Sequence, residues 1–143
     1  MVNKEFIKRK IFLIEKEFEF LKEFSEFSFQ EIVSDFKKQA IVERLMERII
    51  MRAIDINQHL IAELSTEEMS PPKNYKETFL KLADLKIYPK EFAKNISKSV
   101  GTRNILVHQY DEIDYSQIYS SISDCLKDYY QYCDYIFKFL EKN

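Results

Sequence analysis

The scarcity of turn-forming residues constrains the fold most, because the chain has one glycine and three prolines among 143 residues. Hairpins and sheets rely on these residues for their tight turns, so this sequence has little material for building them. Hydrophobic residues make up 45% of the chain, enough for a sizeable core in a domain of this length. We therefore expect an all-α fold in which residues 1–143 form a single domain.

Apolar residues recur at helical spacing in five stretches, which predict an antiparallel bundle of about five helices. The stretches are separated by a serine-rich segment at 25–28, by Ser70-Pro71-Pro72, by the Tyr88-Pro89 step, and by the turn residues Asp111 and Asp114. The first expected helix covers about 3–24, and the second runs from a capping box at Ser28 and Glu31 to about Leu64. The third covers 75–84 and is capped by Asn74, and the fourth runs from Pro89 as first helical residue to near His108. The fifth begins at Asp114 or Ser116 and runs almost to the C-terminus.

The nearly balanced charge argues against a histone-like nucleic-acid binder. With 22 basic and 24 acidic residues, any binding to nucleic acid must come from a local patch. Cys125 and Cys133 would lie about 12 Å apart along one helix, so they cannot bond each other. No second Cys/His pair has ligand spacing, and no apolar run approaches the ~18 residues that span a membrane. We expect a cytoplasmic protein with reduced thiols and with neither metal nor cofactor.

Three arginines form a stripe on the second predicted helix. Arg44, Arg48 and Arg52 are spaced i, i+4, i+8 and share one face, and Glu43 and Glu47 are near enough to pair with Arg48 or its neighbours. One interpretation is a solvent-exposed helix face on which the charged side chains form salt bridges with one another. The other is a basic surface that contacts an RNA backbone.

The segment RNILVHQY, residues 103–110, combines residue types suited to phosphate chemistry. The planar guanidinium group of arginine has several N–H donors whose geometry fits phosphate oxygens, and histidine is the side chain whose ordinary pKa lies near neutrality. An arginine and a histidine can together cleave RNA without a metal. The alternative is a helix end in which Arg103 pairs with an acidic neighbour, His108 caps the last carbonyls and Tyr110 packs with its hydroxyl hydrogen-bonded.

The spacing of Arg103 and His108 favours a site built from two chains. Five residues on a regular helix turn by about 500°, or 140° modulo a turn, so the two side chains diverge. They converge if the end of the helix is distorted, or if two chains each contribute both residues near a two-fold axis. Cleavage by transesterification needs a base, an acid and positive charge, and one His108 cannot comfortably transfer both protons. We therefore favour a symmetric homodimer.

Three stretches of the chain resemble the HEPN superfamily, and specifically its HepT-like toxin branch. They are IVERLMERIIMRAIDINQHLIAEL at 41–64, PPKNYKETFLKLADLKIYP at 71–89 and SVGTRNILVHQYDEID at 99–114. The second is similar to the Pro-x-x-Tyr segment of that family, and the third to its G-x-R-N-x-L-V-H-x-Y block. The resemblance covers about residues 41–119, whereas the chain ends match only in being helical.

The resemblance implies an all-α dimer that acts as a metal-independent endoribonuclease and as the toxin half of a toxin–antitoxin pair. Arg103 and His108 match the catalytic positions of the family, and Asn104 matches a supporting polar residue that orients the phosphate or the imidazole. Tyr110 matches the tyrosine to which an MntA-like nucleotidyltransferase antitoxin transfers AMP from ATP. Whether toxin and antitoxin assemble into a larger complex is left open.

Two questions stay open at this point. The chain could instead be a non-catalytic helical binding partner or regulatory subunit of a minimal nucleotidyltransferase, its motif serving to bind nucleotide phosphate. Asp111 and Glu112 would repel RNA unless they bind the partner, hold the tautomer of His108 or point away from the site.

Overall fold

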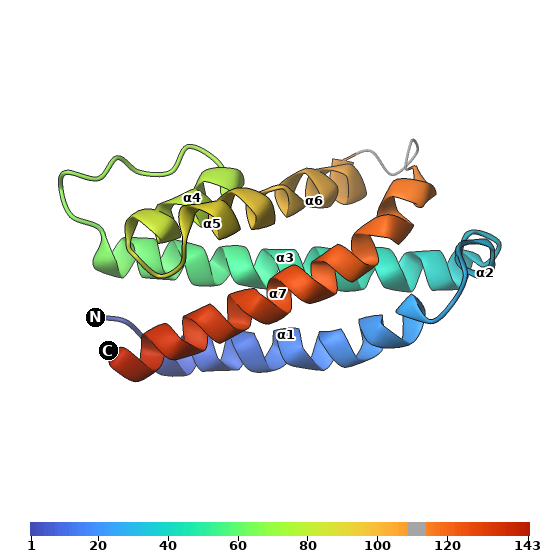
Figure 1. The fold of residues 1–143 in the computed structure, drawn as a ribbon, viewed down its shortest axis with the longest axis horizontal. Coiled ribbons are helices and arrows are strands. Elements are labelled where there is room, and N and C mark those ends of the chain that lie inside the picture. The colour runs from blue at the N-terminus through green and yellow to red at the C-terminus, as the bar shows by residue number, and fades with distance from the viewer. Residues whose placement is uncertain (109–113) are drawn as a thin grey trace.

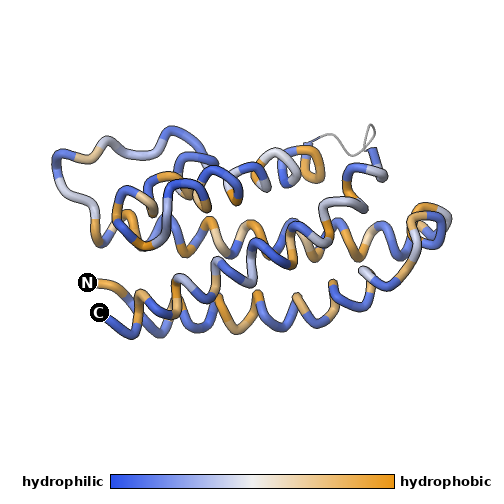
Figure 2. The backbone as a smooth tube through the Cα atoms, in the orientation of Figure 1, coloured by the Kyte–Doolittle hydropathy of each residue, from blue (hydrophilic) through white to orange (hydrophobic). Residues whose placement is uncertain are grey.

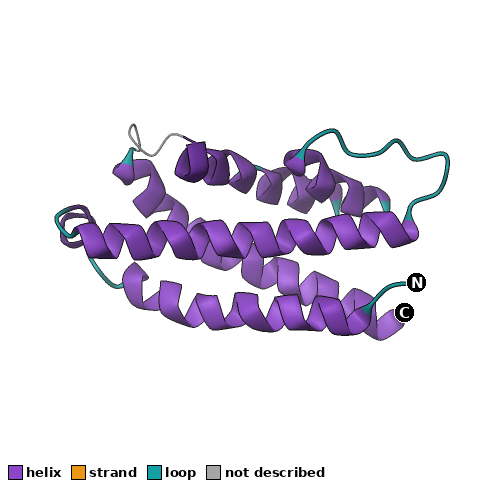
Figure 3. Cartoon of the chain, turned by 180° about the vertical axis from the view of Figure 1, so that it is seen from behind, coloured by secondary structure: helices purple, strands orange, loops and turns teal. Residues whose placement is uncertain are grey.

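The computed structural model describes residues 1–108 and 114–143, and over these ranges the chain contains helices and loops but no strand (Figure 3). The all-α prediction is confirmed. The helices are α1 (Lys4–Ser25), α2 (Phe29–Val33), α3 (Phe36–Leu64), α4 (Tyr75–Asp84), α5 (Lys90–Ser97), α6 (Ser99–His108) and α7 (Tyr115–Lys142). Across the same two ranges, no helix has the length and apolarity that crossing a membrane requires.

Helix α3 is the central element of the bundle. Helix α1 lies along one side of it and α4, α5 and α6 lie along the other, while α7 crosses α3 diagonally from the end of α6 to the start of α1 (Figure 1). Helices α1 and α6 run antiparallel to α3, and both chain termini lie at the end of the bundle remote from α2. Hydrophobic and hydrophilic residues alternate along the long helices (Figure 2), and the buried members of this pattern form one core.

Three helix starts follow the capping chemistry that the sequence predicts. The Ser28 hydroxyl accepts from the backbone N–H of Glu31, whose carboxylate accepts from the backbone N–H of Ser28, which is the expected capping box. Asn74 caps α4 by accepting from the N–H of Glu77 at 2.9 Å. Asp114 caps α7 through the N–H of residue 116 at 3.0 Å.

The prediction of one continuous helix over 28–64 is wrong, because the chain forms α2 and α3 there. The Ser34 hydroxyl donates to the carbonyl oxygen of Gln30 at 2.6 Å, which satisfies a carbonyl at the end of α2. Asp35 then accepts from the backbone N–H of Lys37 at 2.9 Å and serves as a second N-cap. The extra cap starts α3 as a new helix.

The predicted helix over 89–108 is also divided, into α5 and α6. Pro89 is the N-cap of α5, one position before the predicted one. At Lys98 the backbone N–H donates to the carbonyl oxygen of Asn95 at 3.2 Å, a tightened turn that ends α5. Ser99 opens α6, and its hydroxyl lies 2.6 Å from the hydroxyl of Tyr129 on α7. These two breaks raise the expected five helices to seven in the described residues.

A buried polar network joins α3, α4 and α7. Asn57, which has no exposed surface, donates from Nδ2 to Thr78 Oγ1 at 3.1 Å. Tyr132, equally buried, donates from its hydroxyl to Asn57 Oδ1 at 2.5 Å. Buried polar groups of this kind must find partners, so the network fixes how α4 is placed on the core.

The two cysteines on α7 are free and buried, as their helical spacing predicts. Burial is the main reason why the pKa of the Cys125 thiol is raised to about 12. The pKa of the Cys133 thiol is raised to about 12 for the same main reason.

Candidate active site on helix α6

The exposed face of α6 carries two of the predicted site residues. Gly101, Asn104 and His108 are all exposed, and their i, i+3, i+7 spacing places them in one stripe along the helix. His108 is the last residue of α6, where the helix dipole favours a positive charge. The imidazole is therefore accessible to a substrate.

Arg103 reaches this face through its long side chain. Its guanidinium carbon lies 5.3 Å from the centre of the Tyr75 ring, and its Nη1 donates to Asn104 Oδ1 at 3.2 Å. Asn104 is one helical turn before His108, so it brings the guanidinium toward the histidine face. The angle between Arg103 and His108 on a regular helix underestimates how near the guanidinium comes to the His108 face, because that angle ignores the length of the arginine side chain. No hydrogen bond joins Arg103 to His108 within residues 1–108.

Tyr75, on which Arg103 stacks, is held by the start of α4. Asn74 caps this helix and makes Tyr75 its first residue. The Thr78 hydroxyl donates to the Tyr75 carbonyl oxygen at 2.6 Å, and the same hydroxyl accepts from the buried Asn57. A chain of hydrogen bonds therefore connects the core to the ring that supports Arg103.

An open groove of about 700 Å³ lies between the start of α4 and α6. Three cations line it, Lys76, Lys98 and Arg103, and no carboxylate among residues 1–108 and 114–143 does. Among the described residues Arg103 forms no ion pair, and its buried Nε has no hydrogen-bond partner. The groove is therefore locally positive in a molecule of net charge −2, which suits an anionic ligand.

Sequence reasoning missed the groove residues Tyr75, Lys76, Lys98 and Gly101. The signal that could have found Tyr75 was the Pro-x-x-Tyr segment, which marks a position worth attention but gives no partner. Tyr75 and Arg103 are 28 positions apart, and only the packing of α4 beside α6 brings them together. The lysines had no distinguishing pattern among the other charged residues.

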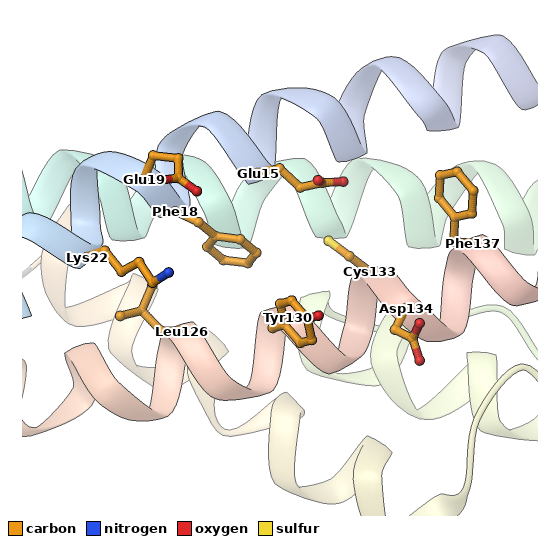
Figure 4. A pocket seen from close by; sticks show the side chains of 9 residues that line it. All are labelled: Glu15, Phe18, Glu19, Lys22, Leu126, Tyr130, Cys133, Asp134 and Phe137. Atoms are coloured by element: carbon orange, nitrogen blue, oxygen red, sulfur yellow. The ribbon is translucent and has the colours of Figure 1, made fainter.

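A second groove, of about 310 Å³, lies between α1 and α7 on the other side of α3 (Figure 4). Its lining includes the carboxylates of Glu15, Glu19 and Asp134 and a single cation, Lys22. Carboxylates repel phosphate, so this groove does not suit a nucleic acid.

The arginine stripe is held largely by α1. Arg48 Nε lies 3.0 Å and Arg52 Nη2 2.8 Å from Glu17 Oε1, whereas Arg44 pairs with Glu47 on its own helix at 3.2 Å. The expected pairing within the helix is met by Arg44 and Glu47, whereas Arg48 pairs with Glu17 of α1. Helix α1 lies on the side of α3 opposite α6, so Arg48 and Arg52 are not brought to Arg103 (Figure 1). Contact between the stripe and RNA stays a prediction.

Tyr110, Asp111 and Glu112 lie outside the described residues, so the expected modification of Tyr110 stays a prediction. Within residues 1–108 and 114–143, no three His, Cys, Asp or Glu side chains gather in a way that could hold a metal ion.

Residues 14–136 match the sequence model of a family described as ribonuclease HepT-like. The chain is 38% identical to the tRNA nuclease HepT of Aphanizomenon flos-aquae over 136 residues, covering 94% of this chain and 89% of the relative. It is 28% identical to the mRNA nuclease HepT of Shewanella oneidensis over 102 residues, covering 71% and 74% of the two chains.

A solved structure shares the arrangement of helices. It is the tri-AMPylated HEPN toxin of Shewanella oneidensis in complex with an MNT antitoxin, which matches with a TM-score of 0.81 at 25% identity. The match covers 93% of this chain and 97% of the toxin. The family match, the 38% identity and the exposed Arg103-Asn104-His108 arrangement agree, and the chain belongs to the HepT-like ribonuclease family.

Proposed function

We propose that this ribonuclease is the toxin of a toxin–antitoxin pair and cleaves RNA in the cytoplasm as a metal-independent dimer. The observation that carries the proposal is the exposed His108 on the same helix as the hydrogen-bonded Arg103 and Asn104, which line a groove that no carboxylate of the described residues lines. Two HepT relatives are named as tRNA and mRNA nucleases, which supports RNA as the substrate class.

In the proposed reaction, one His108 imidazole takes the proton of a ribose 2′-hydroxyl, and the 2′-oxygen attacks the adjacent phosphorus. The bond from phosphorus to the 5′-oxygen breaks, and that oxygen takes a proton from a protonated imidazole. The products are a 2′,3′-cyclic phosphate and a 5′-hydroxyl. Arg103 stabilises the charge that grows on the non-bridging oxygens, and Asn104 holds the guanidinium in place.

A homodimer supports this chemistry because it supplies two imidazoles. In a two-fold cleft, one His108 would act as base while the other, protonated, would act as acid. Symmetric dimers are the commonest homo-oligomers, and both copies would present the same α6 face.

The proposal predicts cleavage in the absence of divalent metal. The purified chain, incubated with total tRNA and with mRNA in EDTA, should yield discrete fragments ending in 2′,3′-cyclic phosphate. The rate should match that in Mg²⁺, because the imidazoles and Arg103 replace the metal in moving protons and offsetting charge. End-group analysis of the fragments provides the measurement, and a mock purification from cells without the gene controls for contaminating nuclease.

Two outcomes of that assay count against the proposal. Activity that disappears in EDTA and returns with Mg²⁺ would contradict the metal-independent mechanism. Intact RNA with a folded, unmodified dimer would favour a non-catalytic binding partner of a nucleotidyltransferase.

The antitoxin is proposed to be an MntA-like nucleotidyltransferase that transfers AMP to Tyr110. The Shewanella toxin named above is AMPylated and bound to an MNT antitoxin, which supports this partner class. Each AMP would place a phosphodiester with about one negative charge two residues from His108, where it competes with RNA for Arg103.

We expect incubation with such an enzyme and ATP to silence the wild-type chain and to leave the Tyr110→Phe variant active. The phenylalanine lacks the hydroxyl that accepts AMP. Intact mass spectrometry should show AMP increments on the wild type only, and omission of ATP is the control. A silenced and modified Tyr110→Phe variant would place the acceptor elsewhere.

A further inference from the structure

The only glycine of the chain occupies a position that the protein itself does not explain. Gly101 lies inside α6, is exposed, and does not have a positive φ. A Cβ atom built on it would meet no described atom within 4 Å. Alanine would therefore fit both the backbone and the packing at this position.

Glycine in the middle of a helix costs stability relative to alanine, because it loses more backbone freedom on folding. A glycine kept there without a turn, a positive φ or a crowded neighbour calls for another reason. One such physical reason is the close approach of another molecule to the bare helix backbone.

The surroundings of Gly101 indicate what approaches. It lies in the wall of the groove of about 700 Å³ together with Lys76, Lys98 and Arg103, and among the described residues no carboxylate lines that groove. Three cations around an open groove suit a polyanion.

We infer that the bare backbone at Gly101, flanked by Lys76 and Lys98, is a subsite for the RNA nucleotide next to the scissile phosphate. The inference rests on the proposed ribonuclease function. Gly101 and His108 share one face of α6, about 10 Å apart along its axis at 1.5 Å per residue. A strand lying along this stripe would contact the glycine backbone at one end and present a phosphodiester to His108 at the other.

The test is the Gly101→Ala variant, compared with wild type and with Ser123→Ala. Ser123 is an exposed position inside α7 that does not line the groove, so its variant controls for helix propensity alone. Both variants should fold, and Gly101→Ala should melt about 3 °C higher than wild type. Its kcat/KM for RNA should nevertheless fall about tenfold or more, mainly through KM, because the methyl group displaces the strand.

Binding is measured separately, so that failure of the proposed function can be told apart from failure of this inference. In a His108→Ala background, fluorescence anisotropy with a labelled single-stranded RNA should show weaker binding when Gly101→Ala is added. A Lys76→Ala/Lys98→Ala variant should flatten the dependence of log affinity on log salt by about 1.4, at about 0.7 per lost phosphate contact.

Two outcomes would overturn the inference, and a third would support it while refuting the proposed function. Unchanged cleavage and binding by a stabilised Gly101→Ala variant would show that nothing approaches the glycine. A shift in the monomer–dimer equilibrium of that variant in analytical ultracentrifugation, with RNA affinity per dimer unchanged, would assign the bare backbone to a second copy of the chain. An inactive wild type that still binds RNA at Gly101 would refute the ribonuclease mechanism and keep the subsite.

Discussion

Replacing His108 with alanine should reduce RNA cleavage by about 10³- to 10⁴-fold, since proton transfer by a positioned group contributes up to that range. His108 is exposed at the end of α6, so its loss removes the base and acid without disturbing the core. Arg103→Ala should cost about 10²- to 10³-fold, the range for losing one charge-stabilising donor. Single-turnover rates on a defined RNA provide the measurement.

The chain offers a matched control in its only other histidine, His59. This imidazole is partly buried between α1 and α3, accepts from the backbone N–H of Asn3 at 2.9 Å and contacts the Phe6 ring. His59→Ala should therefore lower the melting temperature slightly and leave cleavage unchanged. Equal losses in both histidine variants would attribute the effect to folding and not to the site.

Mixing wild-type and His108→Ala subunits tests whether two imidazoles are needed. After re-equilibration, the fraction of dimers with two wild-type chains is the square of the wild-type fraction. Activity that follows this square supports a shared cleft in which both histidines act. Activity proportional to the wild-type fraction would mean that each chain carries a complete site.

Glu17→Ala should destabilise the fold by about 3 kcal/mol, because a buried carboxylate is removed from two arginines. The Glu17 side chain is 8% exposed and Arg52 is 14% exposed, so Arg52 would be left nearly buried without its partner. The corresponding fall in melting temperature is about 10 °C for a domain of this size. Thermal and urea unfolding measure the change.

Glu19→Ala is the matched control for Glu17→Ala. Glu19 is on the same helix, is exposed, and makes no ion pair with any described residue. Its replacement should change the free energy of unfolding by no more than about 0.5 kcal/mol. Equal unfolding midpoints for the two variants would show that the arginines do not depend on Glu17.

The same pair of variants addresses the role of the arginine stripe. If Arg48 and Arg52 served RNA, releasing them from Glu17 would raise RNA affinity in Glu17→Ala. If they serve only to bind α1 to α3, stability falls and RNA affinity does not rise. Arg44, which is more exposed and pairs only within α3, remains the member of the stripe best placed to meet an external anion.

The starts of the helices were predictable where a side chain caps the first turn of the helix that follows it. Ser28, Asn74 and Asp114 each have the residue type and spacing of an N-cap, and each caps a helix in the structure. The break at Asp35 was less visible, because an aspartate within an amphipathic pattern is as often a solvated helical residue. The break at Lys98 has no proline or glycine to mark it in the sequence, and there the Ser99 hydroxyl donates to the Ile96 carbonyl oxygen at 2.7 Å and also meets Tyr129 of α7.

The candidate site was predictable in its residues and less so in its geometry. Arg103, Asn104 and His108 lie within six positions, so a motif can carry them. Arg103 stacks on Tyr75 of α4, and Arg48 and Arg52 form ion pairs with Glu17 of α1. Both contacts depend on which helices pack together, and this is not encoded in a local motif. Helical rotation placed Arg103 and His108 on different faces, and only the Arg103-Asn104 hydrogen bond revealed how one side chain crosses between them.

The burial of both cysteines gives this protein an internal reporter of opening. Alkylating reagents and aromatic disulfides react with the thiolate, and with each pKa at about 12 the folded chain holds almost none at pH 8. In an unfolded chain the same thiols regain their ordinary pKa and are labelled readily. The rate of thiol labelling therefore reports how often the folded chain opens around α7, and no dye has to be attached for this measurement. A surface cysteine engineered for fluorescence work would be modified alone, since the native pair stays silent while α7 remains packed.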